Sequence, residues 1–209
     1  MDADDSTLVA ALAQSYETSK FIATTLGTSA NLNRSERLAV ASLNLCLDHR
    51  EATLLLANHG ARSSAFAMMR PVFEACVRGC WFGFVATDLQ INAMFANRLS
   101  TKLEQMVRAV GKEEPALKVL SSVASIFKEQ LDHFTHGSGP QLARCFNHEA
   151  IAPRHTAGEV IDVLRFIDPI ALIACAAREK ICQRPTAPFL DRLAAAGSPA
   201  RKIKMPAVQ

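Results

Sequence analysis

One long apolar segment, residues 62–87, constrains the fold of this chain more than any other feature. It carries a row of charges, Arg70, Glu74 and Arg78, spaced four residues apart. On a helix this spacing places the three side chains on one face, within reach of one another. A helix that is otherwise apolar is usually buried in a bundle, and charges within it need partners. We therefore expect a buried ion-pair ladder in which Glu74 bonds at least one arginine.

Pro71 leaves two interpretations of this segment open. A proline inside a helix removes a hydrogen bond and kinks the axis, whereas a proline in the first turn is well tolerated. Because no polar break surrounds Pro71, we expect one kinked helix over residues 62–87. The alternative is a short helix that ends at Met69, followed by a new helix that begins with Pro71.

Capping signals and helical periodicity predict further helices on both sides of this segment. The predicted helices cover residues 6–26, 34–58, 62–87, 88–110, 115–136 and 157–182, with capping boxes at Asn33–Glu36, Thr87–Gln90 and Thr156–Glu159. A very short connection at Gly60 implies that the two helices beside it form an antiparallel hairpin. No segment alternates apolar and polar residues as a half-buried strand does. The predicted fold class is all-α, a single bundle of about six helices.

The C-terminal segment, residues 184–209, differs from the rest in composition. It is rich in Pro and Ala and holds five Lys or Arg against one Asp, a net charge of +4. Because the whole chain carries +3, residues 1–183 carry about −1 and lack the basic excess that attracts nucleic acid. We expect residues 1–183 to form the helical bundle domain. Residues 184–209 should be a disordered basic tail, with at most a short turn at 189–195.

The sequence also predicts the compartment. The first residues, MDADDSTL, are acidic and do not resemble a secretory signal, and no apolar stretch is long enough to cross a membrane. The six cysteines contain no CxxC pair, so we interpret them as reduced core residues of a cytoplasmic protein. We predict no membrane partner, no cofactor and no metal site.

A second candidate site is the sequence LDHFTHG, residues 131–137. His133 and His136 end a predicted helix just before the loop GSGPQ, and Gln141 and Arg144 follow at once. Histidines at a helix end can simply complement the helix dipole. They can also supply general acid–base chemistry or bind a divalent metal ion. If the loop folds back, we expect one polar cleft formed by Arg70, Glu74, Arg78, His133, His136 and Arg144.

Two segments together carry a resemblance to a known group. The sequence RSSAFAMMRPVFEACVRGCWF, followed by a helix ending in HFTHG and then by QLAR, resembles a group of uncharacterised bacterial helical proteins. That group is distantly similar to the HEPN superfamily of RNA-cleaving toxins and abortive-infection proteins. The likeness covers residues 34–182. It implies an all-α bundle, often a dimer, and in some members metal-independent RNA cleavage near the dimer interface.

The chain departs from the HEPN pattern at one point. Active HEPN ribonucleases carry an arginine and a histidine separated by four to six residues, and no arginine of this chain has that spacing. Arg144 and His148 have three residues between them, and Lys128 and His133 have the spacing without the arginine. A cleaving site would therefore combine different helices. The candidate catalytic residues are Arg78, His133 and His136, and the candidate substrate-binding residues are Arg70, Glu74, Gln141 and Arg144.

These observations lead to one expected function and two alternatives. We expect a HEPN-like protein that binds RNA or a nucleotide, acts as a metal-independent ribonuclease in phage defence or a toxin–antitoxin pair, and forms a homodimer. One alternative is a non-enzymatic helical module that binds a partner protein, and a weaker one is a single-metal hydrolase. Exposed Arg78 and His136 lining one cleft would favour the first function. Buried and fully paired charges without a cleft would favour the second.

Overall fold

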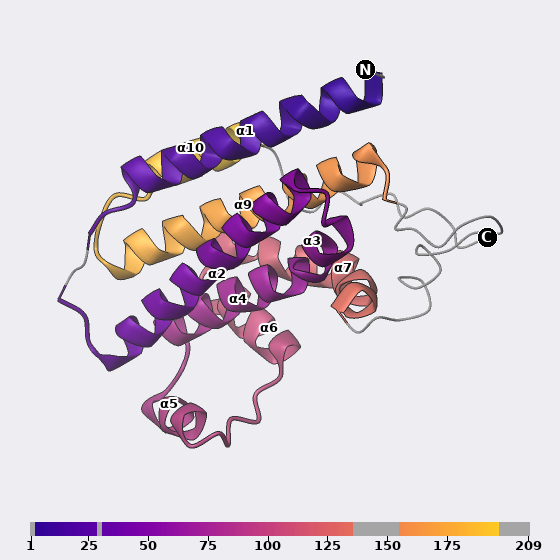
Figure 1. The fold of residues 1–209 in the computed structure, drawn as a ribbon. Helices are drawn as coiled ribbons and strands as arrows, with labels where there is room; N and C mark the ends of the chain where they lie inside the picture. The colour runs from indigo at the N-terminus through magenta and orange to yellow at the C-terminus, as the bar shows by residue number, and fades with distance from the viewer. Residues whose placement is uncertain (1–2, 29–30, 136–154, 197–209) are drawn as a thin grey trace.

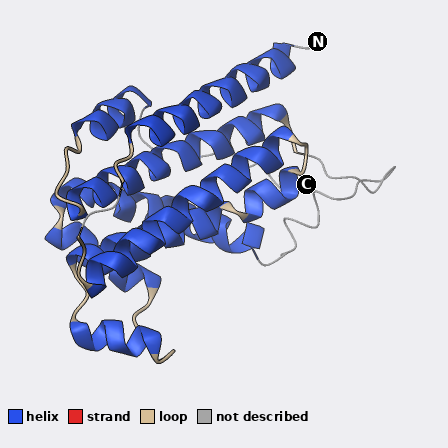
Figure 2. Cartoon of the chain, turned by 60° about the vertical axis from the view of Figure 1, so that its left-hand side comes forward, coloured by secondary structure: helices blue, strands red, loops and turns tan. Residues whose placement is uncertain are grey.

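The computed structural model describes residues 3–28, 31–135 and 155–196, with the backbone alone for residues 3–4, 127–130 and 132–135. This part of the chain is helical and contains no strand, as Figure 1 and Figure 2 show, so the predicted all-α class is confirmed. The elements in order are α1 (Ala3–Thr25), α2 (Arg34–Asn58), α3 (Arg62–Ala67), α4 (Met69–Phe84), α5 (Asp88–Phe95), α6 (Leu103–Glu113), the 3₁₀ turn η1 (Pro115–Leu117), α7 (Val119–Thr135), α9 (Ala157–Ile181) and α10 (Ala187–Ala196).

Helix α4 lies at the centre of the bundle and packs against α2, α6 and α9. Two glycines allow its close approach to neighbours. A Cβ atom at Gly79 would lie 2.5 Å from the Leu43 side chain on α2, and one at Gly83 would lie 2.5 Å from the Ile181 side chain on α9. The large side chains of α4, including Trp81, are buried beside these contacts. The apolar segment that dominates the sequence is therefore the core helix, as expected.

The prediction of one continuous helix over residues 62–87 is wrong, because the helix is interrupted at Met68, between α3 and α4. Pro71 is the third residue of α4, where backbone amides have no helical acceptor to lose. Because Pro71 has no amide hydrogen, it cannot donate to the carbonyl of Ala67, the last residue of α3. The helical hydrogen-bond pattern is therefore interrupted between α3 and α4. Met68 keeps nearly helical angles, with φ −75° and ψ −14°, so the interruption is slight.

The helix predicted over residues 88–110 is two helices, α5 and α6. Helix α5 ends before Asn97, whose φ of 53° is the left-handed conformation that terminates many helices. Helix α6 begins after Lys102, whose amide donates to the Gln105 side chain at 2.9 Å. Asn97 was a stop signal that the sequence interpretation overlooked. As a result α5 projects from the rest of the bundle, as both views show (Figure 1, Figure 2).

Helix α10 lies within the segment that the sequence assigned to the tail. Its Phe189 is 1% exposed and packs with Ile22 of α1 and Leu172 of α9. The Phe189 ring meets the edge of the Phe21 ring at 5.5 Å between centroids. The packed part of the chain therefore extends to residue 196 rather than stopping at 183, and residues 197–209 lie outside the described residues.

Two smaller predictions are confirmed by local geometry. In each of the three capping boxes, at Asn33–Glu36, Thr87–Gln90 and Thr156–Glu159, side chains and backbone amides bond reciprocally. The five described cysteines are buried and free of disulfides. Burial raises the pKa of Cys175 to about 12, so its thiol stays neutral at physiological pH. Within the described residues, no helix is both long and apolar enough to span a bilayer.

Candidate functional site

Arg70, Glu74 and Arg78 form a charged ridge along α4. The Nε of Arg70 donates to Glu74 Oε1 at 2.7 Å, and Nη2 of Arg78 lies 3.6 Å from Glu74 Oε2. The Glu74 carboxylate is therefore shared between two guanidinium groups, one a helical turn before it and the other a helical turn after it. This is the pairing that the four-residue spacing predicts.

The ridge is not buried, which corrects the expectation for Glu74. The side chains of Arg70, Glu74 and Arg78 are 27%, 25% and 38% exposed. Neighbouring side chains of α4 such as Phe73 and Val77 point into the core and are almost fully buried. The ridge lies on the remaining face of α4, where a charged side chain keeps part of its hydration. The ion pairs are thus accessible to a ligand.

A hollow of about 330 Å³ opens on one side of the ridge. Its walls come from α4, α6, α7 and the loop before α6. Three cationic side chains and two carboxylates line it, namely Arg70, Arg78, Lys102, Glu74 and Glu104, beside apolar groups that include Leu103 and Val107. Among its described lining residues, positive side chains outnumber negative ones, whereas residues 1–183 have no positive excess overall.

A second, smaller hollow of about 270 Å³ lies on the other side of the ridge, toward α2. Its walls are the ridge itself together with Leu45, His49, Pro71 and Ala75. His49 is a half-buried histidine that the sequence interpretation overlooked. The sequence held a signal for this position. Residues equally far from the turn of an antiparallel hairpin lie side by side, and His49 and Pro71 are equally far from Gly60, where the predicted hairpin turns.

Arg78 is the ridge residue with the most uncommitted donors. Its 3.6 Å approach to Glu74 is too long for a hydrogen bond, and no other polar partner approaches it among the described residues. Guanidinium is planar, stays charged at any physiological pH, and presents five N–H donors that match phosphate or carboxylate. Glu74 holds the adjacent side of the ridge in place through Arg70. This arrangement can receive an anion.

The predicted cleft is tested only in part. Arg70, Glu74 and Arg78 meet beside a hollow. His133 belongs to α7, but its side chain is outside the described part, as are His136, Gln141 and Arg144 altogether. Helix α7 does border the hollow through Ala124 and Leu131. Convergence of the two histidines with the ridge stays a prediction.

A buried charged cluster, centred on Arg50 of α2, was missed in the sequence. Arg50 is fully buried and donates from Nη2 to Asp168 Oδ1 on α9 at 2.6 Å and to Ser15 Oγ on α1 at 2.7 Å. Its Nη1 also donates to Glu51 Oε1 at 2.5 Å. The cluster thereby ties together three helices. The available signal was position, since Arg50 occupies the same helical face as the buried Leu43, Cys46 and Leu54.

Asp168 is the mostly buried carboxylate of this cluster, with a side chain that is 14% exposed against 44% for Glu51. Three donors, two from Arg50 and one from Ser15, all bond its Oδ1. Burial raises the pKa of the Asp168 carboxyl, and the charge of Arg50 opposes that rise only in part. Across the parts of the chain that the structure describes, no group of three His, Cys, Asp or Glu side chains could hold a metal ion.

Comparison with known proteins identifies the family but no function. The model of the family DUF6988, described as a family of unknown function, matches residues 43–188, and the chain belongs to that family. No curated protein and no solved structure matches the chain. The matched range contains the charged ridge, both hollows beside it, Arg50 and Asp168.

Proposed function

We propose that this member of the DUF6988 family binds RNA through the charged ridge and cleaves it without a metal ion, in the manner of the HEPN-like proteins that its sequence resembles. The observation that supports the proposal is the state of Arg78. Its side chain is 38% exposed, has a single loose ion pair of 3.6 Å among the described residues, and borders a hollow of about 330 Å³. A guanidinium in this state suits a phosphate group.

The surroundings of Arg78 support phosphate rather than a neutral ligand. Among the described lining residues, Arg70 and Lys102 add positive charge to the same hollow, and Glu74 and Glu104 cancel only part of it. Because residues 1–183 have no positive excess overall, this attraction is local to the ridge. The volume lies in the lower range of pockets that hold nucleotide-sized ligands, about 300–1,000 Å³. Apolar walls at Leu103 and Val107 offer a surface for a ribose or base.

The proposed reaction needs a histidine as proton acceptor. Its imidazole takes the proton of the ribose 2′-hydroxyl, the 2′-oxygen bonds to phosphorus, and the bond to the 5′-oxygen breaks. The leaving 5′-oxygen takes up a proton, which gives a 2′,3′-cyclic phosphate and a 5′-hydroxyl. Arg78 stabilises the negative charge that develops on the phosphorane. His49 borders the ridge, and His133 and His136 are the candidates from the sequence.

The test is binding and cleavage of a 5′-labelled single-stranded RNA in the presence of EDTA. The wild-type chain should bind the RNA and produce 2′,3′-cyclic phosphate ends. Arg78→Ala should weaken binding about tenfold, since a hydrogen bond between charged groups contributes about 1.5–3 kcal/mol. It should also reduce the slope of log affinity against log salt by about 0.7. The matched control is Arg37→Ala, which removes an exposed arginine of α2 away from both hollows.

Three single variants, His49→Ala, His133→Ala and His136→Ala, identify the proton acceptor. Substitution of the histidine that accepts the proton should abolish cleavage. RNA affinity should stay within about threefold of wild type, because a group that acts in the transition state adds little to ground-state binding. Equal RNA affinity for Arg78→Ala and Arg37→Ala would overturn the proposed binding site. RNA binding that depends on Arg78 without any cleavage would overturn the ribonuclease part. A role in phage defence or a toxin–antitoxin pair predicts growth arrest on expression, relieved by Arg78→Ala.

A second candidate function, an interaction module, is favoured by helix α5. Leu89 is 81% exposed and Phe95 is 60% exposed on this projecting helix, and Arg34 covers one face of the Phe95 ring at 4.6 Å. Apolar side chains this exposed commonly mark protein contacts when they cluster. The homodimer that the resemblance implies would use such a surface. Light scattering should then show a dimer that Leu89→Glu converts to a monomer, and a wild-type monomer would exclude it.

A further inference from the structure

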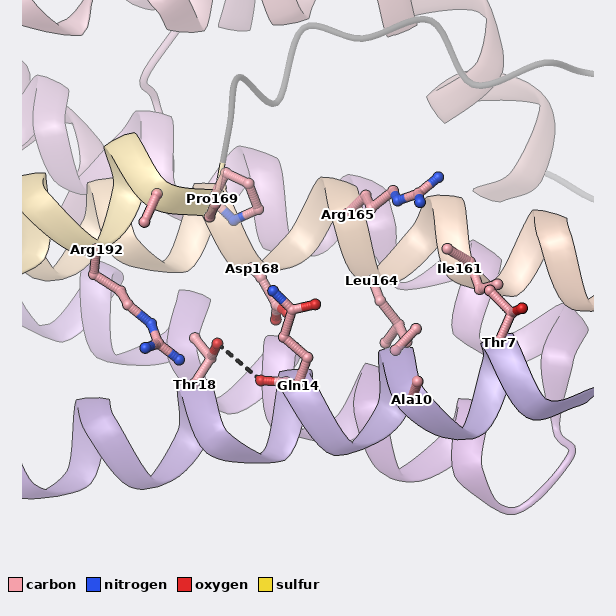
Figure 3. A pocket seen from close by; sticks show the side chains of 13 residues that line it. Thr7, Ala10, Gln14, Thr18, Ile161, Leu164, Arg165, Asp168, Pro169 and Arg192 are labelled. Atoms are coloured by element: carbon pink, nitrogen blue, oxygen red, sulfur yellow. Dashed lines mark hydrogen bonds between the residues drawn. The ribbon is translucent and has the colours of Figure 1, made fainter.

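A cavity of about 500 Å³ lies between α1, α9 and α10, away from the charged ridge. Figure 3 shows its walls: Gln14 and Thr18 project from α1, Asp168 and Leu164 from α9, and Arg192 from α10. Its volume is in the range of pockets that hold small organic ligands. Its lining shares no residue with the two hollows beside the ridge, so a ligand bound in this cavity does not depend on RNA binding at the ridge.

Asp168 presents one carboxylate oxygen to this cavity. Arg50 and Ser15 together occupy Oδ1, and within the described residues no donor approaches Oδ2. The Asp168 side chain is only 14% exposed, yet it forms part of the cavity wall. Oδ2 is not among the buried side-chain atoms that lack a partner, so it is accessible from the cavity, and a donor that enters the cavity can bond it in place of water.

The charge around Asp168 favours a cationic donor. Arg50 shares its positive charge between two carboxylates, the 14% exposed Asp168 at 2.6 Å and the 44% exposed Glu51 at 2.5 Å. Burial also raises the pKa of Asp168, which means that the lost hydration of its charged form outweighs the contacts with Arg50 and Ser15. An ammonium group at Oδ2 would supply that stabilisation.

Arg192 gives the cavity an opposite pole. In Figure 3 its guanidinium reaches from α10 toward Thr18, and it lies over the Phe21 ring at 5.4 Å. No carboxylate pairs with Arg192 in the described part of the chain. The guanidinium of Arg165, by contrast, points away from α1 in Figure 3 and pairs with Asp162 at 3.5 Å. Arg192 is therefore the group placed to meet an anion inside the cavity.

We propose that this cavity binds a free α-amino acid with an aliphatic side chain. Its ammonium bonds Asp168 Oδ2 and its carboxylate pairs with Arg192. The aliphatic side chain packs on the apolar wall at Ala10, Ile161 and Leu164. A simple amine would be repelled by Arg192 and a simple acid by Asp168, so a zwitterion satisfies both poles.

The test is calorimetric titration of the full chain with L-leucine, L-leucinamide and 4-methylpentanoate. Leucine should bind, and the other two should bind at least tenfold more weakly, because one lacks the carboxylate and the other the ammonium group. A second measurement is thermal stability with each of the twenty amino acids at millimolar concentration. Aliphatic ones should raise the melting temperature most. If no amino acid binds, or if leucinamide or 4-methylpentanoate binds as tightly as leucine, the proposal is overturned.

Variants assign the two poles. Arg192→Gln should weaken leucine binding at least tenfold but should not weaken leucinamide binding, since leucinamide has no carboxylate for Arg192 to pair with and its ammonium is no longer repelled. Asp168→Asn should weaken the binding of leucine and of leucinamide, because both carry the ammonium group. If this variant fails to fold, Arg192→Gln still tests whether leucine binds in this cavity. Lys20→Gln, a change at an exposed residue of α1, is the matched control. Arg78→Ala should leave leucine binding unaltered. Leucine binding that Arg192→Gln does not weaken would place the ligand elsewhere and refute the proposed site.

Discussion

The charged ridge and the Arg50 cluster are both ion-paired, but they differ in burial and in the origin of their partners. In the ridge, partners lie four residues apart on one helix and are at least a quarter exposed. In the cluster, Arg50 is fully buried and its partner Asp168 is 118 residues away in sequence. Exposed pairs contribute little to stability, whereas loss of one partner of a buried pair is strongly destabilising. The ridge can therefore serve a ligand at little cost in stability, whereas the cluster stabilises the fold.

The largest effect should come from Arg50→Ala. The substitution removes both Arg50 donors from the largely buried Asp168 and leaves its charge without a cation, so we expect a loss of about 3–5 kcal/mol in the free energy of unfolding. Urea denaturation measures it, with Arg78→Ala as the matched control. The control should change stability by less than about 1 kcal/mol. Similar losses for both variants would remove the distinction between the two regions.

A slightly smaller loss of stability is expected for Phe189→Ala, which tests whether α10 is packed against α1 and α9, the helices that hold Ser15 and Asp168. Phe189 is 1% exposed between α1 and α9, and truncation of a buried Phe costs about 3 kcal/mol or more. Leu190→Ala, at a side chain that is 46% exposed, should change the urea midpoint little. Equal midpoints for the two variants would show that α10 is not docked, as the sequence-based boundary at residue 183 assumed.

Local signals in the sequence predicted what local physics determines. The capping boxes and the four-residue spacing of Arg70, Glu74 and Arg78 are contacts between neighbours in sequence, so the all-α class and the ridge pairing could be predicted. The left-handed turn at Asn97 was also a local signal, but one asparagine among polar residues is weak evidence for a break. Burial of Glu74 was predicted wrongly because apolar composition does not say which face of a helix turns inward.

Non-local contacts could not be predicted in this way. Arg50 meets Ser15 and Asp168 only because α1 and α9 pack against α2, and no spacing in the sequence encodes that meeting. Phe189 likewise gave no local signal of docking within a Pro- and Ala-rich segment, because its buried contacts come from α1 and α9. Only part of the candidate site could therefore be predicted. Arg70 and Arg78 lie on one helix at a recognisable spacing, whereas His49 comes from another helix.

The smallest effect on stability, and the sharpest test of the ridge, is expected for Glu74→Ala. Glu74 is 25% exposed and pairs with Arg70 at 2.7 Å, so its removal should lower the free energy of unfolding by less than about 1 kcal/mol. The same change removes a negative charge and leaves Arg70 and Arg78 without their shared carboxylate. RNA affinity at low salt should therefore rise, and the increase should vanish at high salt because the attraction is screened. A loss of several kcal/mol would mean that the ridge is buried in the protein as it exists in solution, for example against a second copy. Lower RNA affinity would mean that Glu74 orients Arg78 for phosphate and that the ion pair is part of the binding site itself.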